Sequence, residues 1–278
     1  MADFVSFPKR GLISVSGPDA ATLLDGLLTH NVDRAGPTSS VYAAMLTPQG
    51  KFLYELFILA PEPGSYWIDV SDPGSFAKRL TLYRLRSKVT IEDKSEAFTV
   101  GAVWQASALG AGALSYADPR SPSLPQRFMA PRADLSTEAV EAFTRYEDQR
   151  LNLGIPDLAA DLLAEKDFIL EGLMDEMGGV DFHKGCYVGQ EMTSRMKRRT
   201  TVKTKLCRVR FEGPAPAFET PILADGWEVG RMRSVGQGLG LALIRFDRAQ
   251  KAVAEGHALL AGEQKVTLDP PDWMTLPA

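Results

Sequence analysis

The first part of the chain shows two different spacings of apolar residues. Some stretches place an apolar residue at every second position, which is typical of strands, and others place them three or four apart, which is typical of helices. Turn sequences such as Thr47-Pro48-Gln49-Gly50 separate these stretches. The predicted elements are a strand at 11–16, a helix from about 19 to near 30, a hairpin of strands at 41–46 and 51–60, a strand at 66–70, a helix from 73 to about 86 and a strand at 88–92. This mixed order predicts an α+β fold rather than a doubly wound sheet, in which strands and helices alternate strictly.

The middle of the chain has fewer periodic stretches and more prolines. Strands are predicted at 98–104 and 128–130, on either side of a proline-rich loop at 118–125. A helix is predicted to begin near Ser136 and to run through Asn152, because a glycine and a proline follow it.

From residue 206 the pattern changes to short strands separated by glycine, proline and aspartate, which predicts a small antiparallel barrel or sandwich. These strands are predicted at 206–211, 221–224, 227–232, 240–246, 258–260 and 265–268. We therefore expect three domains. They are an N-terminal α+β domain over 1–95, a second α+β domain over 96–200 and a small C-terminal β-barrel over 201–278.

Composition narrows the class of protein. The chain has 278 residues, of which 45% are apolar and 24% charged, as in a water-soluble globular protein. The net charge of −4 excludes an overall positive field that would attract nucleic acid. The two cysteines, Cys186 and Cys207, are too few for a disulfide framework, so we expect a reducing compartment: the cytoplasm, or the mitochondrial matrix if the protein is eukaryotic. No apolar leader or membrane-spanning stretch is seen, so no membrane association is expected.

The candidate chemistry centres on the sequence Lys184-Gly-Cys-Tyr-Val-Gly-Gln-Glu-Met-Thr-Ser-Arg195. Its two glycines permit backbone angles that would present the Cys186 sulfur rather than bury it. Lys184 and Arg195, if they fold toward that sulfur, would lower its pKa. A short helix is predicted from Gln190, which places Cys186 just ahead of the positive end of the helix. The structural alternative is a glycine-rich turn around an ordinary buried cysteine.

The segment Lys184-Gly-Cys-Tyr-x-Gly-Gln-Glu191 resembles the signature of the YgfZ family. This family is related to the glycine-cleavage T-protein and to the mitochondrial iron–sulfur cluster assembly factor. Weaker similarities follow in order along most of the chain, for example at Asp118-Pro-Arg120 and Arg150-x-x-x-Gly154-Ile-Pro156. The resemblance implies a GcvT-like α+β fold, with two α+β subdomains and a C-terminal antiparallel β-barrel around a central cleft. It also implies a role in iron–sulfur cluster assembly or repair, including in tRNA-modifying enzymes.

The resemblance further implies that the cleft binds tetrahydrofolate or a one-carbon derivative. A folate requires an aromatic slot, a few directed polar groups and cations for its glutamate tail. The candidate folate-binding residues are Asn31, Tyr83, Arg86, Arg150 and Tyr187. The candidate catalytic residues are Cys186, as a nucleophile, redox thiol or transient ligand, and Lys184, which would lower its pKa. Structural roles remain open for the folate candidates, because Tyr83 lies on an apolar helical stripe and lone arginines usually form ion pairs.

An aminomethyltransferase of the T-protein type is the main alternative function. That chemistry requires a carboxylate near the reacting nitrogen, and T-proteins place an Asp early in the helix after the third strand. Ser75-Phe76-Ala77 occupy this place here and contain no carboxylate. Whether the chain is an enzyme, such as a folate-dependent transferase, therefore stays open. The second alternative is a tRNA or protein interaction module without turnover.

Two further features bear on partners. Asp181, His183 and Cys186 are fewer ligands than a closed metal site needs, so no resident metal is predicted. A basic run over 195–210 could contact tRNA phosphates, although a solvated surface is the usual role of such a run. Its members are Arg195, Lys197, Arg198, Arg199, Lys203, Lys205, Arg208 and Arg210. The expected partners are a reduced folate, iron–sulfur proteins or their assembly machinery, and tRNA.

Overall fold

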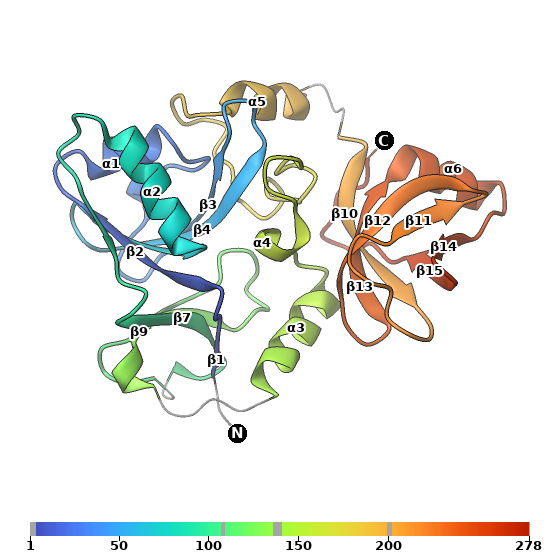
Figure 1. Cartoon of the computed structure of the whole chain (residues 1–278), viewed down its shortest axis with the longest axis horizontal. Coiled ribbons are helices and arrows are strands. Elements are labelled where there is room, and N and C mark those ends of the chain that lie inside the picture. The colour runs from blue at the N-terminus through green and yellow to red at the C-terminus, as the bar shows by residue number, and fades with distance from the viewer. Residues whose placement is uncertain (1–3, 107–108, 136–140, 199–201, 278) are drawn as a thin grey trace. The chain divides into compact units, whose positions relative to one another are not determined.

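The computed structural model describes residues 4–106, 109–135, 141–198 and 202–277 (Figure 1). The predicted start of a helix at Ser136 lies outside these residues. The chain forms two compact units. The first comprises residues 1–49, 53–146 and 177–190, and the second comprises 50–52, 147–176 and 191–278. The predicted division into domains over 1–95, 96–200 and 201–278 stays a prediction.

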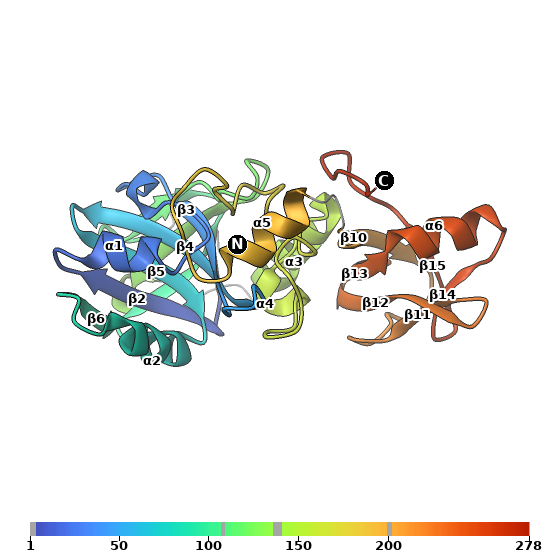
Figure 2. The same ribbon diagram turned by 90° about the horizontal axis from the view of Figure 1, so that it is seen from above.

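The first unit contains a five-stranded sheet of order β3-β4-β5-β2-β6. Its strands are β2 (Arg10–Ser16), β3 (Val41–Leu46), β4 (Phe52–Glu62), β5 (Ser65–Ser71) and β6 (Thr90–Asp93). Two helices, α1 (Ala20–Asp25) and α2 (Pro73–Arg84), share one apolar core with the sheet. Leu24 of α1 and Phe76 and Leu80 of α2 are fully buried in this core. Figure 2 shows α2 beside β2 and β6. The predicted hairpin and both predicted helices are confirmed, although α1 ends at Asp25, earlier than the predicted end near residue 30.

A second, four-stranded sheet in the same unit has the order β1-β7-β9-β8. Its strands are β1 (Phe4–Ser6), β7 (Phe98–Val103), β8 (Leu114–Tyr116) and β9 (Gln126–Pro131). Strands β7 and β9 were predicted. Strands β1 and β8 were not, because each has 3 residues, too few to show a period. Two 3-10 turns, η1 (Val32–Arg34) and η3 (Arg132–Asp134), lie in loops of this unit.

A buried cluster of charges joins residues of the two sheets. The Arg10 guanidinium lies 2.9 Å from a carboxylate oxygen of Glu55 and 2.6 Å from one of Asp69. Arg127 of β9 also pairs with Asp69, and its guanidinium lies 3.7 Å from the centre of the Phe57 ring. The full set of charges is Arg10, Arg120, Arg127, Glu55, Asp69 and Asp118. Three cations therefore balance three carboxylates in a place where an unpaired charge would be strongly destabilising.

The second unit contains a closed barrel of order β10-β13-β12-β11-β14-β15, which confirms the predicted C-terminal barrel. Its strands are β10 (Thr204–Phe211), β11 (Pro221–Ala224), β12 (Trp227–Val235), β13 (Leu239–Arg245), β14 (Leu259–Ala261) and β15 (Gln264–Leu268). The helices are α3 (Ala142–Leu153), α4 (Leu158–Asp161), α5 (Gln190–Arg198) and α6 (Phe246–Ala254). Helix α6 was not predicted, because only Phe246 among its buried residues is a large apolar residue and the other two are alanines.

Candidate functional site

The first part of the predicted motif lies in a loop of the first unit, residues 181–189, which we call the motif loop, and residues 190–195 lie in α5. Two backbone hydrogen bonds tie the ends of this loop to the segment after α1. The Asp181 N–H donates to the Thr29 carbonyl at 2.9 Å, and the Val188 N–H donates to the Gly26 carbonyl at 3.1 Å. The Thr29 hydroxyl adds a bond of 2.7 Å to the Gly179 carbonyl. The motif loop is therefore held at both ends by residues 26–29.

Lys184 holds the middle of the motif loop. Its ammonium donates to the Asp25 carbonyl at 2.8 Å, the Asp25 Oδ1 at 2.9 Å, the Leu28 carbonyl at 2.9 Å and the His30 carbonyl at 3.0 Å. These carbonyls follow the C-terminal end of α1, where the helix dipole favours a cation. The Lys184 side chain is only 1% exposed. Since an ammonium has three N–H donors, these four oxygens use all of them.

Cys186 is exposed, whereas Cys207 is buried in β10. Gly189, between Cys186 and α5, has a φ of 85°, which a residue with a side chain rarely adopts. The Gln190 side-chain amide lies 3.5 Å from the Gly185 carbonyl. Helix α5 begins at Gln190, as predicted. The glycine-flanked loop therefore presents the Cys186 sulfur to solvent, and the buried-cysteine alternative does not apply to Cys186.

Burial shifts the protonation of the residues under the motif loop. Burial lowers the pKa of Lys184 from its ordinary value, and the neighbouring Asp25 carboxylate offsets part of that effect. Burial also lowers the pKa of His30, which favours a neutral imidazole. The Lys184 ammonium is engaged by the protein, so its main role in the structure is to fix the motif loop. Its predicted effect on the Cys186 thiol stays a prediction.

Asn31 and Tyr187 lie in the same region as Lys184. The Asn31 Oδ1 accepts the Asp33 N–H at 2.8 Å and so caps η1, directly after the His30 carbonyl that Lys184 binds. The Tyr187 ring is buried, and its centre lies 5.5 Å from the Lys184 ammonium. The structure therefore brings Asn31, Lys184, Cys186 and Tyr187 together around the end of α1.

The other two candidates of the first unit belong to α2 and the residues after it. Tyr83 is partly buried and packs against the core of the five-stranded sheet, as its structural alternative expected. Arg86 is exposed and lines an open hollow of about 710 Å³ together with Asp19, Leu85 and Ser87. Of the two, Arg86 has the side chain that a dissolved ligand can reach.

Arg150 belongs to the second unit and is fully engaged there. Its guanidinium donates to both carboxylate oxygens of Glu147 at 2.7 and 2.6 Å and to the Asp161 carboxylate at 3.1 Å. The remaining donors reach the Ser234 hydroxyl at 2.8 Å and the Ile155 carbonyl at 3.4 Å. A contact between Arg150 and a folate would therefore require one of these bonds to break.

Carboxylates neutralise most of the predicted basic run. The pairs are Arg195 with Glu191, Lys197 with Asp175, Lys203 with Asp247, Lys205 with Glu176, and both Arg208 and Arg210 with Asp269. The remaining members are Arg198, which bonds to the Ser194 carbonyl, and Arg199, which lies outside the described residues. A phosphate at this run would have to compete with these carboxylates.

Asp181, His183 and Cys186 were considered as metal ligands in the sequence and judged too few for a closed site. The Asp181 carboxylate accepts the His183 N–H at 2.9 Å, so the two residues form a local turn. Within the part of the chain that the structure describes, no three His, Cys, Asp or Glu side chains are grouped to hold a metal ion. Over the same residues, no helix is both long and apolar enough to cross a bilayer.

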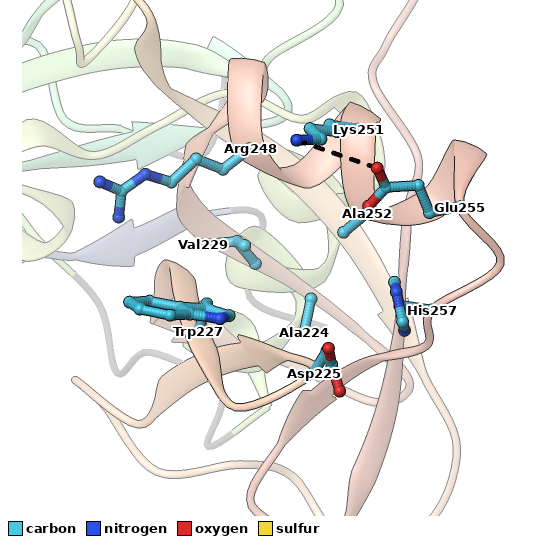
Figure 3. A pocket seen from close by; sticks show the side chains of 9 residues that line it. All are labelled: Ala224, Asp225, Trp227, Val229, Arg248, Lys251, Ala252, Glu255 and His257. Atoms are coloured by element: carbon cyan, nitrogen blue, oxygen red, sulfur yellow. Dashed lines mark ion pairs between the residues drawn. The ribbon is translucent and has the colours of Figure 1, made fainter.

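The barrel has a cavity of its own, of about 380 Å³, between α6 and the turn that joins β11 to β12 (Figure 3). Trp227 and Arg248 lie at one end, and Asp225 and His257 lie at the other. The Lys251 ammonium lies 3.9 Å from Glu255, which is drawn as a dashed line. Two cations and two carboxylates line the cavity, so it presents no net charge to a ligand.

Asp25 and the backbone carbonyls that accept hydrogen bonds from the Lys184 ammonium were not predicted. Nothing in the sequence marks Asp25, which ends an ordinary apolar helix. Backbone carbonyls bind through their position alone, so no residue type identifies them. Only the three-dimensional structure could show that Lys184 points toward residues 25–30.

Comparison with known proteins identifies the family. Residues 203–276, which hold all six barrel strands, match the model of a family described as "CAF17, C-terminal beta-barrel domain". Over 298 residues the chain is 31% identical to the human "Iron-sulfur cluster assembly factor IBA57, mitochondrial", and this alignment covers 95% of the chain and 83% of the human protein. The chain belongs to the IBA57 family.

A second IBA57 relative, from Neurospora crassa, is 33% identical over 253 residues. That alignment covers 81% of the chain and 57% of the Neurospora protein, so the chain spans little more than half the length of this relative. The names of both relatives describe them as mitochondrial. The IBA57 family is the cluster assembly family that the sequence resemblance named as related. The YgfZ name itself stays a prediction.

The fold has a counterpart among solved structures. The crystal structure of glycine cleavage system aminomethyltransferase T from Bartonella henselae matches with a TM-score of 0.73 and covers 98% of this chain and 86% of that one. The sequence identity is 12%, so the likeness shows the fold alone. It confirms for this IBA57 family member the predicted GcvT-like α+β fold with a C-terminal barrel.

Proposed function

We propose that this chain is an iron–sulfur cluster assembly factor whose reactive residue is Cys186. The observation that carries the proposal is the exposed Cys186 thiol on a loop that Lys184 fixes to the first unit. A fixed, exposed thiol can be presented to another protein in one geometry. The cluster assembly function in the names of the IBA57 relatives supports this assignment.

In this proposal Cys186 acts as a transient ligand to a cluster that is cargo. A [2Fe–2S] cluster is usually held by four cysteine thiolates. Cys186 would lose its proton to water, because the thiolate is the ligand form, and would supply one of the four. A partner protein would supply the others, and the cluster would pass on as thiolates of the recipient replace these ligands on the iron atoms. The recipients would include iron–sulfur enzymes that modify tRNA.

A reduced folate, tetrahydrofolate or a one-carbon derivative, is the small ligand that the sequence resemblance implies. Arg86 supports this part of the proposal, because its exposed guanidinium forms no ion pair with the described residues and could meet a glutamate-tail carboxylate. Asn31 and Tyr187 offer polar and aromatic groups beside the motif loop. Direct tRNA binding through residues 195–210 is less well supported, because carboxylates already pair with those cations.

No observation favours aminomethyl transfer as a second function. The first turn of α2 contains no acidic residue. Phe76 there is buried in the core, and the Ser75 hydroxyl lies 2.8 Å from that of Tyr54. The place at which T-proteins carry their early carboxylate is therefore occupied by packing contacts. Catalysis with turnover stays open for the chain.

The test uses the purified chain and an assembly protein loaded with a [2Fe–2S] cluster. Absorption and circular dichroism in the visible range would follow the cluster as the two proteins form a complex. We expect the wild type to change the spectrum of the cluster and Cys186→Ser to leave it unchanged. Cys207→Ser is the matched control, because Cys207 is buried and should not affect ligation. A spectral change that survives in Cys186→Ser would overturn the proposed role.

The folate part has its own test. Calorimetry with tetrahydrofolate and an aminomethyl transfer assay on the same sample separate binding from catalysis. Binding without transfer supports a folate-binding assembly factor. Transfer would instead select the aminomethyltransferase. If the chain does not bind tetrahydrofolate at any concentration, the folate leaves the proposal, and the cluster role can still be tested.

A further inference from the structure

The outer face of α2 differs from every other charged part of the chain described above. Residues 73–91 contain no carboxylate. The same stretch carries five cations, which are Lys78, Arg79, Arg84, Arg86 and Lys88. Lys78, Arg84, Arg86 and Lys88 form no ion pair with any of the described residues. Most cations of the predicted basic run at 195–210 pair with carboxylates, whereas four of the five cations in this stretch do not.

Two leucines stand among these cations with their side chains in water. Leu82 is 76% exposed and Leu85 is 86% exposed. Helical spacing places Lys78, Leu82 and Leu85 on one side of α2, opposite the buried Phe76 and Leu80. Single exposed leucines are common, but two of them one turn apart, in a stretch with four unpaired cations, form a small apolar patch. We call this surface, Lys78 to Lys88, the α2 patch.

The backbone at Leu85 gives an independent indication. Leu85 ends α2 with φ of 47° and ψ of −108°, a region that bulky residues rarely occupy. Such a conformation is unfavourable unless the surroundings hold it, and it is enriched at sites of function. Here it turns a leucine side chain toward solvent, next to the hollow that Asp19 and Arg86 line. Asp19 is occupied in part, because its carboxylate accepts the Lys88 N–H at 2.7 Å.

We propose that the α2 patch docks an acidic protein, one that presents carboxylates around a small apolar surface that contacts Leu82 and Leu85. The unpaired cations call for anionic groups, and the paired leucines form the kind of apolar centre with a polar rim that protein interfaces use. RNA fits this surface less well, because the exposed leucines among the cations offer no flat face on which a base can stack. A lipid surface also fits less well, because the main apolar face of α2 is buried in the core of the unit.

The test uses the full chain and three defined probes. The first is a fluorescent helical peptide of about 20 residues with leucines at i, i+3 and i+7 and glutamates at the flanking positions. The second is a vesicle of phosphatidylglycerol and phosphatidylcholine, and the third is a single-stranded RNA oligonucleotide. We expect the peptide to bind, with an affinity that falls as salt is raised. The other two probes should bind at least about tenfold more weakly.

Two variants and a control complete the design. Lys78→Glu/Arg84→Glu should weaken peptide binding by about tenfold or more, because attraction becomes repulsion. Leu82→Ser should weaken it about tenfold through lost apolar contact. Lys203→Glu/Arg210→Glu changes the net charge equally on the neutralised run and should leave binding within about twofold. Lys78 and Arg84 form no ion pair with the described residues, whereas Lys203 pairs with Asp247 and Arg210 pairs with Asp269. Melting curves would verify that each variant folds.

The outcomes decide the proposal without reference to Cys186. Equal weakening by the control pair would mean that only net charge matters and would overturn it. Preferential binding of the vesicle or the RNA would replace the acidic protein with a lipid surface or a nucleic acid. If the peptide does not bind at any accessible concentration, the α2 patch is not a docking surface for such a partner.

Discussion

The Lys184 ammonium lies 2.9 Å from the Asp25 Oδ1, although the two residues are 159 positions apart in the chain. Together with three carbonyls of residues 25–30, this pair fixes the motif loop against the end of α1. The position of the Cys186 thiol therefore depends on the hydrogen bonds of Lys184, two residues before it.

Replacement of Lys184 by Met should destabilise the protein by about 2–4 kcal/mol, because buried carbonyls would lose their donor. Urea unfolding would give the free energy, and hydrogen exchange would show faster opening of residues 181–189. Lys265→Met is the matched control, since Lys265 is exposed and should change stability by less than about 0.5 kcal/mol. Unchanged stability in Lys184→Met would contradict the structural role of this lysine.

His30 should make the stability of the first unit depend on pH. Burial lowers the pKa of its imidazole in the folded state, and the charges that face it are Asp181, Arg34 and Lys184. Above the ordinary pKa of histidine both folded and unfolded chains hold a neutral imidazole, so the group has no effect. As the pH falls below that value the unfolded chain takes up the proton first, and the free energy of unfolding decreases until the lowered folded pKa is passed.

The measurement is urea unfolding at several values between about pH 7.5 and about pH 5.5, where ordinary carboxylates stay ionised. In the His30→Asn variant the free energy of unfolding should change less with pH than in the wild type. His257→Asn, in the exposed loop between α6 and β14, is the control and should keep the pH dependence of the free energy of unfolding. An identical slope in His30→Asn and the wild type would show that His30 does not carry it.

The two cysteines should differ sharply in reactivity. Burial raises the pKa of the Cys207 thiol to about 12, so it stays protonated near neutral pH. Cys186 is exposed to reagent. We expect iodoacetamide to modify one cysteine in the native protein and both in urea, as counted by mass spectrometry. Native Cys186→Ser should take up no label, and a labelled Cys207 in that variant would mean that β10 opens readily.

Arg150 should act on stability rather than on ligand binding. Arg150→Met leaves the fully buried Asp161 without its cation, and loss of one partner of such a pair costs about 3–5 kcal/mol. Arg150→Lys keeps the charge but loses the two-pronged bond to Glu147, so an intermediate loss is expected. Melting temperatures with and without tetrahydrofolate separate the two roles. A variant that melts like the wild type but loses the folate shift would show that Arg150 binds the ligand.

The fold was largely predictable because local patterns encode it. Apolar alternation and turn residues located the hairpin of β3 and β4, and the glycine-separated strands located the barrel. Helix α6 was not predicted, because two of its three buried residues are alanines. The buried ion pairs were not predicted either. Glu55 and Asp69 lie in otherwise apolar strands, and their partners Arg10 and Arg127 come from other parts of the chain.

The site was predictable only where the residues themselves carry the chemistry. A cysteine between two glycines predicts an exposed thiol at Cys186, whereas the acceptors that bind the Lys184 ammonium are mainly backbone carbonyls. The basic run at 195–210 suggested a free positive surface for a related reason. Its acids, such as Asp175 and Asp269, become neighbours only in the folded chain, so the sequence shows a charge that the structure cancels. The cations of α2 keep their charge because no carboxylate interrupts residues 73–91.

The discontinuous path of the first unit has a consequence for the order of events at the ribosome. Residues 177–190 complete a body whose sheets are built from residues 4–131, and they emerge from the exit tunnel after those strands. N-terminal segments generally fold first during synthesis. The carbonyls after α1 therefore wait without their lysine until translation has passed residue 184. A nascent chain that has not reached residue 184 lacks this lysine, so the motif loop and the Cys186 thiol can be fixed only once most of the polypeptide has been made.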